Sequence, residues 1–119
     1  MNIGEFMDWT YIRQKQCSCL LAGVKNAEYS RNDDKLHNFK RAGALLGCTP
    51  HEALIGMWSK HLVSILDMVN DYAATGKIPT SAIIGEKFTD AINYLHLLEG
   101  LFRESQSVNN NAYKAGKKI

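Results

Sequence analysis

Apolar side chains recur at intervals of three and four residues along most of the chain, and this pattern predicts four amphipathic helices. The first is expected over residues 5–26 and the second over 36–46, with a polar, turn-rich loop at 27–34 between them. The third is expected from residue 50 to a stop at Thr75-Gly76, and the fourth from residue 80 or 81 to about 105. No segment alternates with period two between hairpin turns, so no strands are expected. The pattern predicts an all-α, four-helix-bundle-like single domain.

Start and stop residues support these boundaries. Thr49-Pro50-His51-Glu52 matches a capping box with proline at the first helical position. Gly47 is expected to cap the second helix at its C-terminus, and Asp33 or Asp34 to cap its start. Residues 106–119 carry three consecutive asparagines and three lysines. We therefore expect a helical domain at 1–105 followed by a flexible basic tail at 106–119.

The third and fourth expected helices are apolar over more than half of their circumference. Such helices belong at the centre of a bundle, with the first two packed against them. Trp9 and Trp58 are expected as core anchors, and His61 as a hydrogen-bonded core residue. Apolar surface that one small bundle leaves uncovered is usually covered by a partner, so we expect a homodimer or homotetramer.

Composition limits the class of protein and the cellular location that we expect. The chain has 119 residues, of which 45% are hydrophobic and 22% charged, enough for one core. A formal net charge of +2 gives no strong signal for nucleic-acid binding. Cys17, Cys19 and Cys48 are odd in number and lack a zinc-ligand pattern, which favours reduced thiols. No apolar run is long enough to cross a membrane and no export signal begins the chain, so a cytoplasmic protein is expected.

Carboxylates lie at helical spacing on both central helices. Glu86, Asp90 and Asn93 share one stripe of the fourth helix, and Asp67 lies on a polar stripe of the third. If the two helices pack together, Asp67, Glu86 and Asp90 can share one cleft and hold Mg²⁺, which prefers oxygen ligands and substrate phosphates. The same spacing is typical of a solvated helix face, so both interpretations stay open.

The polar loop offers a second cluster. Arg31, Lys35 and the start of the second helix can form an anion site, and Tyr29 can stack on a base. In the catalytic version of this hypothesis Glu28 orients a water molecule, while Lys60 joins Arg31 and Lys35 in binding phosphates. A polar loop before a capped helix is the plainer interpretation of the same residues.

Four segments of the chain resemble small proteins encoded by bacteriophages and prophages. They cover Lys25–Tyr29, Lys35–Arg41, Lys60–Asp67 and Glu86–Tyr94. The last segment is also similar to the acidic helix of the MazG-like all-α NTP pyrophosphohydrolases. That resemblance implies Mg²⁺-dependent hydrolysis of nucleoside triphosphates to monophosphates. The family carries Glu-Glu-x-x-Glu and Glu-x-x-Asp, whereas this chain has only Glu86-x-x-x-Asp90, so only these two residues carry over.

Two hypotheses from different classes follow. The first is a phage nucleotide-handling protein, either a Mg²⁺-dependent NTP pyrophosphohydrolase or a degenerate relative that only binds nucleotide. The second is a non-enzymatic phage inhibitor of host defence that binds a host protein or sequesters a nucleotide signal. Both act in the cytoplasm of a bacterial host. The incomplete acidic motif favours binding over turnover.

Overall fold

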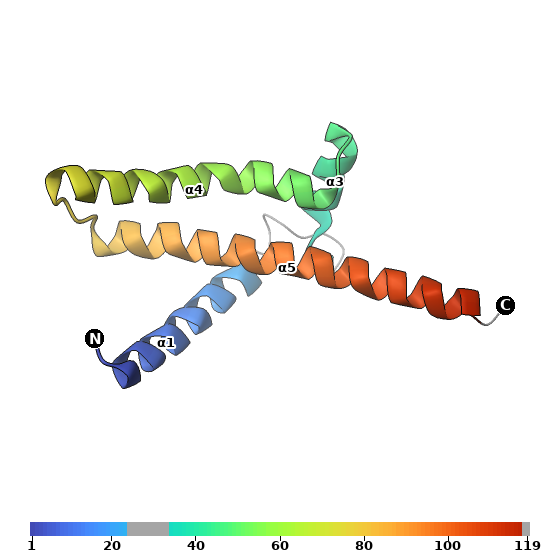
Figure 1. The fold of residues 1–119 in the computed structure, drawn as a ribbon, viewed down its shortest axis with the longest axis horizontal. Helices are drawn as coiled ribbons and strands as arrows, with labels where there is room; N and C mark the ends of the chain where they lie inside the picture. Colours follow the sequence, from blue (N-terminus) through green and yellow to red (C-terminus); the bar gives the residue numbers. More distant parts are fainter. Residues whose placement is uncertain (24–33, 118–119) are drawn as a thin grey trace.

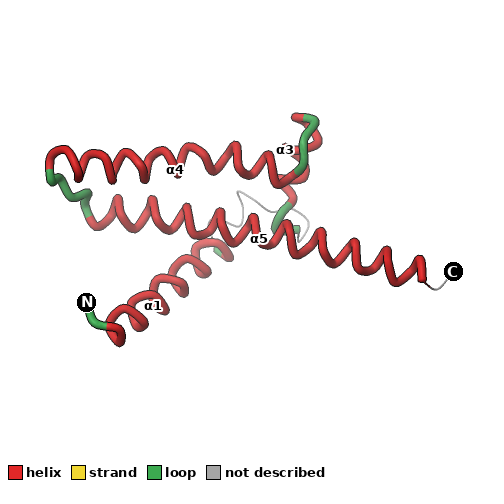
Figure 2. Tube along the Cα trace, viewed as in Figure 1, coloured by secondary structure: helices red, strands yellow, loops and turns green. Residues whose placement is uncertain are grey.

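The computed structural model describes residues 1–23 and 34–117, and this part of the chain is all-α. Its helices are α1 (Ile3–Ala22), α3 (His37–Leu46), α4 (Pro50–Thr75) and α5 (Ser81–Lys117). Figures 1 and 2 show them packed against one another, and no strand occurs among the described residues. The predicted fold class is therefore confirmed. None of the described helices has the length and apolar character that crossing a membrane requires.

The helix ends around α4 follow the capping signals of the sequence. The Thr49 hydroxyl accepts a hydrogen bond from the backbone N–H of Glu52 at 3.1 Å. The Glu52 carboxylate in turn accepts one from the backbone N–H of Thr49 at 3.2 Å, which completes the capping box. Gly47 and Gly76 end α3 and α4 with φ of 70° and 71°, a left-handed conformation that glycine adopts without strain.

Helices α4 and α5 form an antiparallel hairpin on which the other two helices pack. Helix α3 lies against α4, and α1 crosses α5 at an angle (Figure 1). The core lies at the end of the hairpin where α3 joins it. Its buried members come from α3, α4, α5 and the segment just before α3: Leu36, Phe39, Leu54, Tyr94, Leu97 and Leu101. Leu21, Trp58 and Leu98 pack against them from outside.

A glycine permits the tight corner between α3 and α4. A Cβ atom built on Gly43 would lie 2.8 Å from the carbonyl oxygen of Cys48 and 2.9 Å from the nitrogen of Pro50. Both neighbours are backbone atoms that cannot rotate away. The corner therefore requires a residue without a side chain at this position.

Helix α1 differs from the prediction in length and in burial. It ends at Ala22 rather than near residue 26, and its only buried residue is Cys17. The apolar side chains expected to face a core are 41–54% exposed: Phe6, Trp9, Ile12 and Leu20. Trp9 is thus not a core anchor, because α1 packs against α5 alone and only a narrow edge of α1 meets it.

Two further helix boundaries differ from the prediction. Helix α5 continues to Lys117, although we expected it to end near Ser105. Residues 106–115 contain no proline or glycine, so nothing in that segment stops the helix. At the start of α3 the N-cap residue is Leu36, which has no side-chain cap. The Asp34 carboxylate instead accepts a hydrogen bond from the backbone N–H of Leu36 at 3.0 Å, just before the helix.

Candidate functional site

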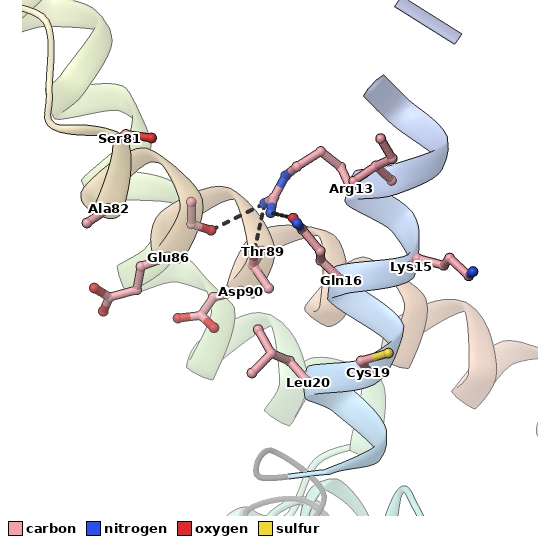
Figure 3. A pocket seen from close by; sticks show the side chains of 12 residues that line it. Arg13, Lys15, Gln16, Cys19, Leu20, Ser81, Ala82, Glu86, Thr89 and Asp90 are labelled. Carbon is pink, nitrogen blue, oxygen red and sulfur yellow. Dashed lines mark hydrogen bonds between the residues drawn. The ribbon is translucent and has the colours of Figure 1, made fainter. Parts of the chain in front are cut away.

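A large hollow lies between the C-terminal half of α1 and the first turns of α5. Its volume is about 910 Å³, in the range of small-molecule sites, and it is open to solvent. Figure 3 shows that charged and polar side chains of both helices line it. They are Arg13, Lys15 and Gln16 from α1, and Glu86, Thr89 and Asp90 from α5. We refer to this hollow as the α1–α5 cleft.

Arg13 joins the two walls of the α1–α5 cleft. Its guanidinium donates to the Thr89 hydroxyl at 2.6 Å and to the backbone carbonyl of Gly85 at 3.4 Å. It also donates to the side-chain oxygen of Gln16 at 2.7 Å, which fixes the guanidinium on the α1 side (Figure 3). All three acceptors are neutral. The positive charge of Arg13 is therefore positioned by the fold without being neutralised by these partners.

Glu86 and Asp90 lie one turn apart on α5, and Figure 3 shows their carboxylates on the same side of that helix. The Asp90 carboxylate lies 3.7 Å from the Nδ1 atom of His61 on α4. The Asp90 carboxylate therefore lies between the α1–α5 cleft and the contact of α5 with α4. His61 also stacks near Tyr94, with ring centroids 5.0 Å apart, so it is a polar residue of the α4–α5 contact.

Asn93 is an unexplained polar group beside the α1–α5 cleft. It lies one turn after Thr89 on α5, on the side that meets α1, and only 3% of it is exposed. Neither its amide nitrogen nor its amide oxygen has a hydrogen-bond partner among the residues that the structure describes. A buried unsatisfied amide costs about 1–3 kcal/mol relative to a satisfied one, so Asn93 weakens this part of the packing.

The remaining predicted site residues lie elsewhere. Asp67 is exposed on α4 and does not line the α1–α5 cleft. Lys60 borders a separate hollow of about 370 Å³ beside the α3–α4 corner. Among the described residues, no three His, Cys, Asp or Glu side chains gather closely enough to hold a metal ion. The structure thus brings Glu86 and Asp90 together but not Asp67. Glu28, Tyr29 and Arg31 lie outside the described residues.

The ammonium group of Lys35 makes a contact within the fold instead of facing an open site where phosphate could bind. Its ammonium group donates a hydrogen bond to the backbone carbonyl of Leu21 near the end of α1. Burial lowers the pKa of Lys35, because a charged ammonium loses solvation there. The residue ties the end of α1 to the segment before α3.

An ionic bridge reinforces the same region. The Lys40 ammonium lies 2.8 Å from the Asp34 carboxylate and 2.6 Å from that of Glu104 on α5. Its hydrogen bond to Asp34 raises the pKa of Lys40. That hydrogen bond and the one from the Leu36 N–H lower the pKa of Asp34. The bridge connects α3 with α5 next to the core.

Sequence reasoning missed Arg13 and Gln16, although both belong to the best-formed polar site. Their spacing of three residues places them on one side of α1, which is the only local signal. The partners of Arg13 on α5 lie 72 and 76 positions further along the chain. Nothing in the first helix alone indicates them.

Comparison of the chain with protein-family models, with curated proteins and with solved structures finds no match. The class that the described structure defines is an all-α helical bundle with an open cleft between α1 and α5.

Proposed function

We propose that the chain is a nucleotide-handling protein that binds a Mg²⁺–nucleotide in the α1–α5 cleft. The observation that carries this proposal is the placement of opposite charges in one hollow of ligand size. Arg13 is held on one wall by neutral acceptors, and the Glu86 and Asp90 carboxylates line the other. A phosphate chain with its cation needs both kinds of charge within reach.

Two carboxylates are enough for this chemistry. Mg²⁺ in nucleotide sites is usually held by one or two protein carboxylates, with phosphate oxygens and water completing its shell. Glu86 and Asp90 would supply the carboxylates, and Arg13 would bind phosphate oxygens. Asp67 is not needed in this arrangement. Hydrolysis would also need a group that orients water, the role predicted for Glu28, so the proposal is limited to binding.

The setting of this proposal follows from the resemblance stated above. The chain would act in the cytoplasm of a bacterial host as a phage-encoded homo-oligomer. A degenerate relative of the MazG-like enzymes that binds nucleotide without turnover agrees with the incomplete acidic motif of Glu86 and Asp90.

Isothermal titration calorimetry against a panel of Mg²⁺–nucleotides tests the proposal. Glu86→Gln removes a carboxylate that is exposed and has no hydrogen-bond partner among the described residues, so the fold should be unaffected. Affinity for the bound nucleotide should fall at least tenfold, about 1.4 kcal/mol. Glu99→Gln, an exposed position further along α5, is the matched control and should leave affinity unchanged. No heat from the wild type with any nucleotide would refute the proposal.

A second candidate is a non-enzymatic inhibitor that binds a host protein, and the exposed face of α1 favours it. Phe6 is 49% exposed, Trp9 48% and Ile12 54%, although α1 packs against the rest of the described structure on one side only. Apolar side chains gathered on an open helix are typical of protein-binding surfaces. This candidate gains support if the calorimetry is silent while Trp9→Ala abolishes binding to an identified host protein.

A further inference from the structure

Each helix of the α4–α5 hairpin carries an unbroken stripe of apolar or small residues on a side that the other described helices leave largely open. The steps along both stripes alternate between four and three residues, which is the heptad spacing of helices that pack along their length. The α4 stripe consists of Ile55, Ser59, Leu62, Leu66, Val69 and Ala73. The α5 stripe consists of Ile84, Phe88, Ala91, Leu95, Leu98 and Phe102.

The two stripes lie on the same face of the hairpin. Where residues of the α4–α5 contact are identified, a stripe residue follows one position later, as Ile55 follows Leu54, Ala91 follows Asp90 and Leu95 follows Tyr94. One position rotates a helix by about 100° in the same sense. Because α4 and α5 run antiparallel, these equal rotations turn both stripes toward one side of the hairpin (Figure 1).

Helix α1 occupies the opposite face. Helix α1 contacts α5 at Thr89, through Arg13. On α5, Thr89 precedes by one position Asp90, a residue of the α4–α5 contact, whereas the stripe residues follow such residues. The rotation from the contact toward α1 therefore has the opposite sense to the rotation toward the stripe. Helix α1 reaches the α5 stripe only at its start, where Ile84 and Phe88 border a hollow beside Trp9. The rest of the stripe surface stays open. Leu66 and Phe102 are each 60% exposed.

The molecule as a whole exposes more surface than a compact monomer of its mass. The chain exposes 8759 Å², whereas about 6,450 Å² is typical for such a monomer. Its radius of gyration is 18.0 Å, whereas about 13.5 Å is typical of a compact domain of this length. The excess of about 2,300 Å² is shared by the stripes, the open side of α1 and the projecting end of α5 (Figure 1), and a standard interface needs only about 800 Å² from each partner.

We propose that the occupant of this face is a second copy of the chain, so that two hairpins pack stripe against stripe as a four-helix bundle. The stripes span 19 residues each, from 55 to 73 and from 84 to 102, so either can lie along the other over its full length. Neither stripe contains a charged residue that would select an oppositely charged partner. A two-fold axis places identical surfaces together, and heptad-spaced helices meet at the shallow angles of such bundles.

This arrangement leaves the other side of the molecule unchanged. Helix α1 and the α1–α5 cleft stay on the outside of the bundle. The stripe face of the hairpin would be the site of the self-association proposed above, and contact through this face does not depend on the nucleotide site. Either proposal can therefore fail without the other.

Light scattering coupled to gel filtration tests the inference on the full chain over a range of concentrations. The wild type should have a mass about twice the 13.3 kDa of one chain. Leu66→Glu places a charge in the middle of the α4 stripe and should raise the dissociation constant at least about 100-fold, because the interface would bury unpaired carboxylates. Leu95→Glu on α5 should do the same.

Val63→Glu is the matched control. Val63 is 55% exposed on the same helix, at the border of the α4 stripe and turned about 60° from Leu66. The control should raise the dissociation constant much less than Leu66→Glu does, and circular dichroism should show the same helix content in all variants. A monomeric wild type at 100 µM, or equal dissociation by Val63→Glu and Leu66→Glu, would overturn the inference. A wild type that is monomeric but binds a different protein through the stripes would overturn it too.

Discussion

The two ends of the α4–α5 hairpin use the same pair of helices and yet bury very different amounts of apolar surface. At the α3 end, Leu54, Tyr94, Leu97 and Leu101 are each no more than 7% exposed. From residue 55 to residue 88, which includes the whole other end, no residue is buried. The α3 end gains a third side from Phe39 of α3 and from Leu36 just before that helix. Two helices alone share one narrow edge, and a third surface is needed to enclose a core.

At the far end the additional helix is α1, which in the described structure packs against α5 and not against α4. His61, Ile65 and Met68 face α5 and are only partly buried. Their neighbours on the α4 stripe stay exposed, whereas Ile84 and Phe88 of the α5 stripe border a hollow beside α1. The stability of the described chain should therefore concentrate at the α3 end, and the far end should depend on a partner.

The largest predicted effect compares one leucine from each end. Leu54→Ala removes a side chain with no exposed surface and should lower the free energy of unfolding by about 2–5 kcal/mol. Leu66→Ala, measured by urea denaturation at concentrations where the chain is monomeric, should change it by less than about 0.5 kcal/mol. Equal losses at both positions would mean that the two ends are not different in the way described.

The second prediction compares two glycines. Gly43→Ala forces backbone atoms of the α3–α4 corner apart and should cost about 1–3 kcal/mol of unfolding free energy. Gly56→Ala, at a helical position with no atom within 4 Å of the added Cβ, should instead stabilise the chain by about 0.5–1 kcal/mol. Thermal denaturation of the two variants measures both. A Gly43→Ala variant as stable as wild type would show that the corner is looser than the structure indicates.

The third prediction concerns the contact between α1 and α5. Asn93→Leu replaces a buried amide without partners by an apolar side chain of the same branching. It should raise the free energy of unfolding by about 1 kcal/mol, because the desolvation cost of the amide disappears. Gln106→Leu, at an exposed position of the same helix, serves as control and should have little effect. Destabilisation by Asn93→Leu would contradict the absence of amide hydrogen bonds.

The smallest predicted effect depends on pH. The pKa of Asp34 is lowered below its ordinary 3.8 by its hydrogen bonds to Lys40 and Leu36. Its ionised form is therefore stabilised by folding, so its contribution is present above pH 3.8 and is lost as the pH falls below that value. Because the carboxylate is partly solvent-exposed, the loss should be under about 1 kcal/mol.

Chemical denaturation at pH 6 and at pH 3 measures this contribution. The stability difference between the two pH values should be smaller in Asp34→Asn than in the wild type. Asp8→Asn, on an exposed turn of α1, should leave the difference as it is. If the wild type and Asp34→Asn had the same pH dependence of stability, Asp34 would not contribute to that dependence.

The sequence predicted the elements of the fold well, because the signals that begin and end a helix are local. The capping box at Thr49 and the two left-handed glycines lie within a few residues of the ends they define. The burial of α1 was predicted wrongly, since Trp9, Ile12 and Leu20 border hollows beside α5 but remain largely exposed there. Periodicity gives the face of a helix but not which neighbour, if any, covers that face.

The candidate site was predicted only in part. Glu86 and Asp90 share the α1–α5 cleft, because residues four apart on one helix must lie on one side of it. Asp67 does not join them, since its position relative to α5 depends on the rotation of α4 in the hairpin. Arg13 could not be found at all, because its contacts join segments that are distant in sequence.

The close approach at Gly43 has a consequence for recognising relatives of this chain. A substitution at an exposed helical position is easily tolerated, but a side chain at residue 43 would collide with the backbone of the following turn. Chains that keep this corner should therefore keep Gly43, Gly47 and the pair Thr49-Pro50 at the same spacing, even where the rest has diverged. A search pattern built on these four positions would detect distant members through the geometry they must share.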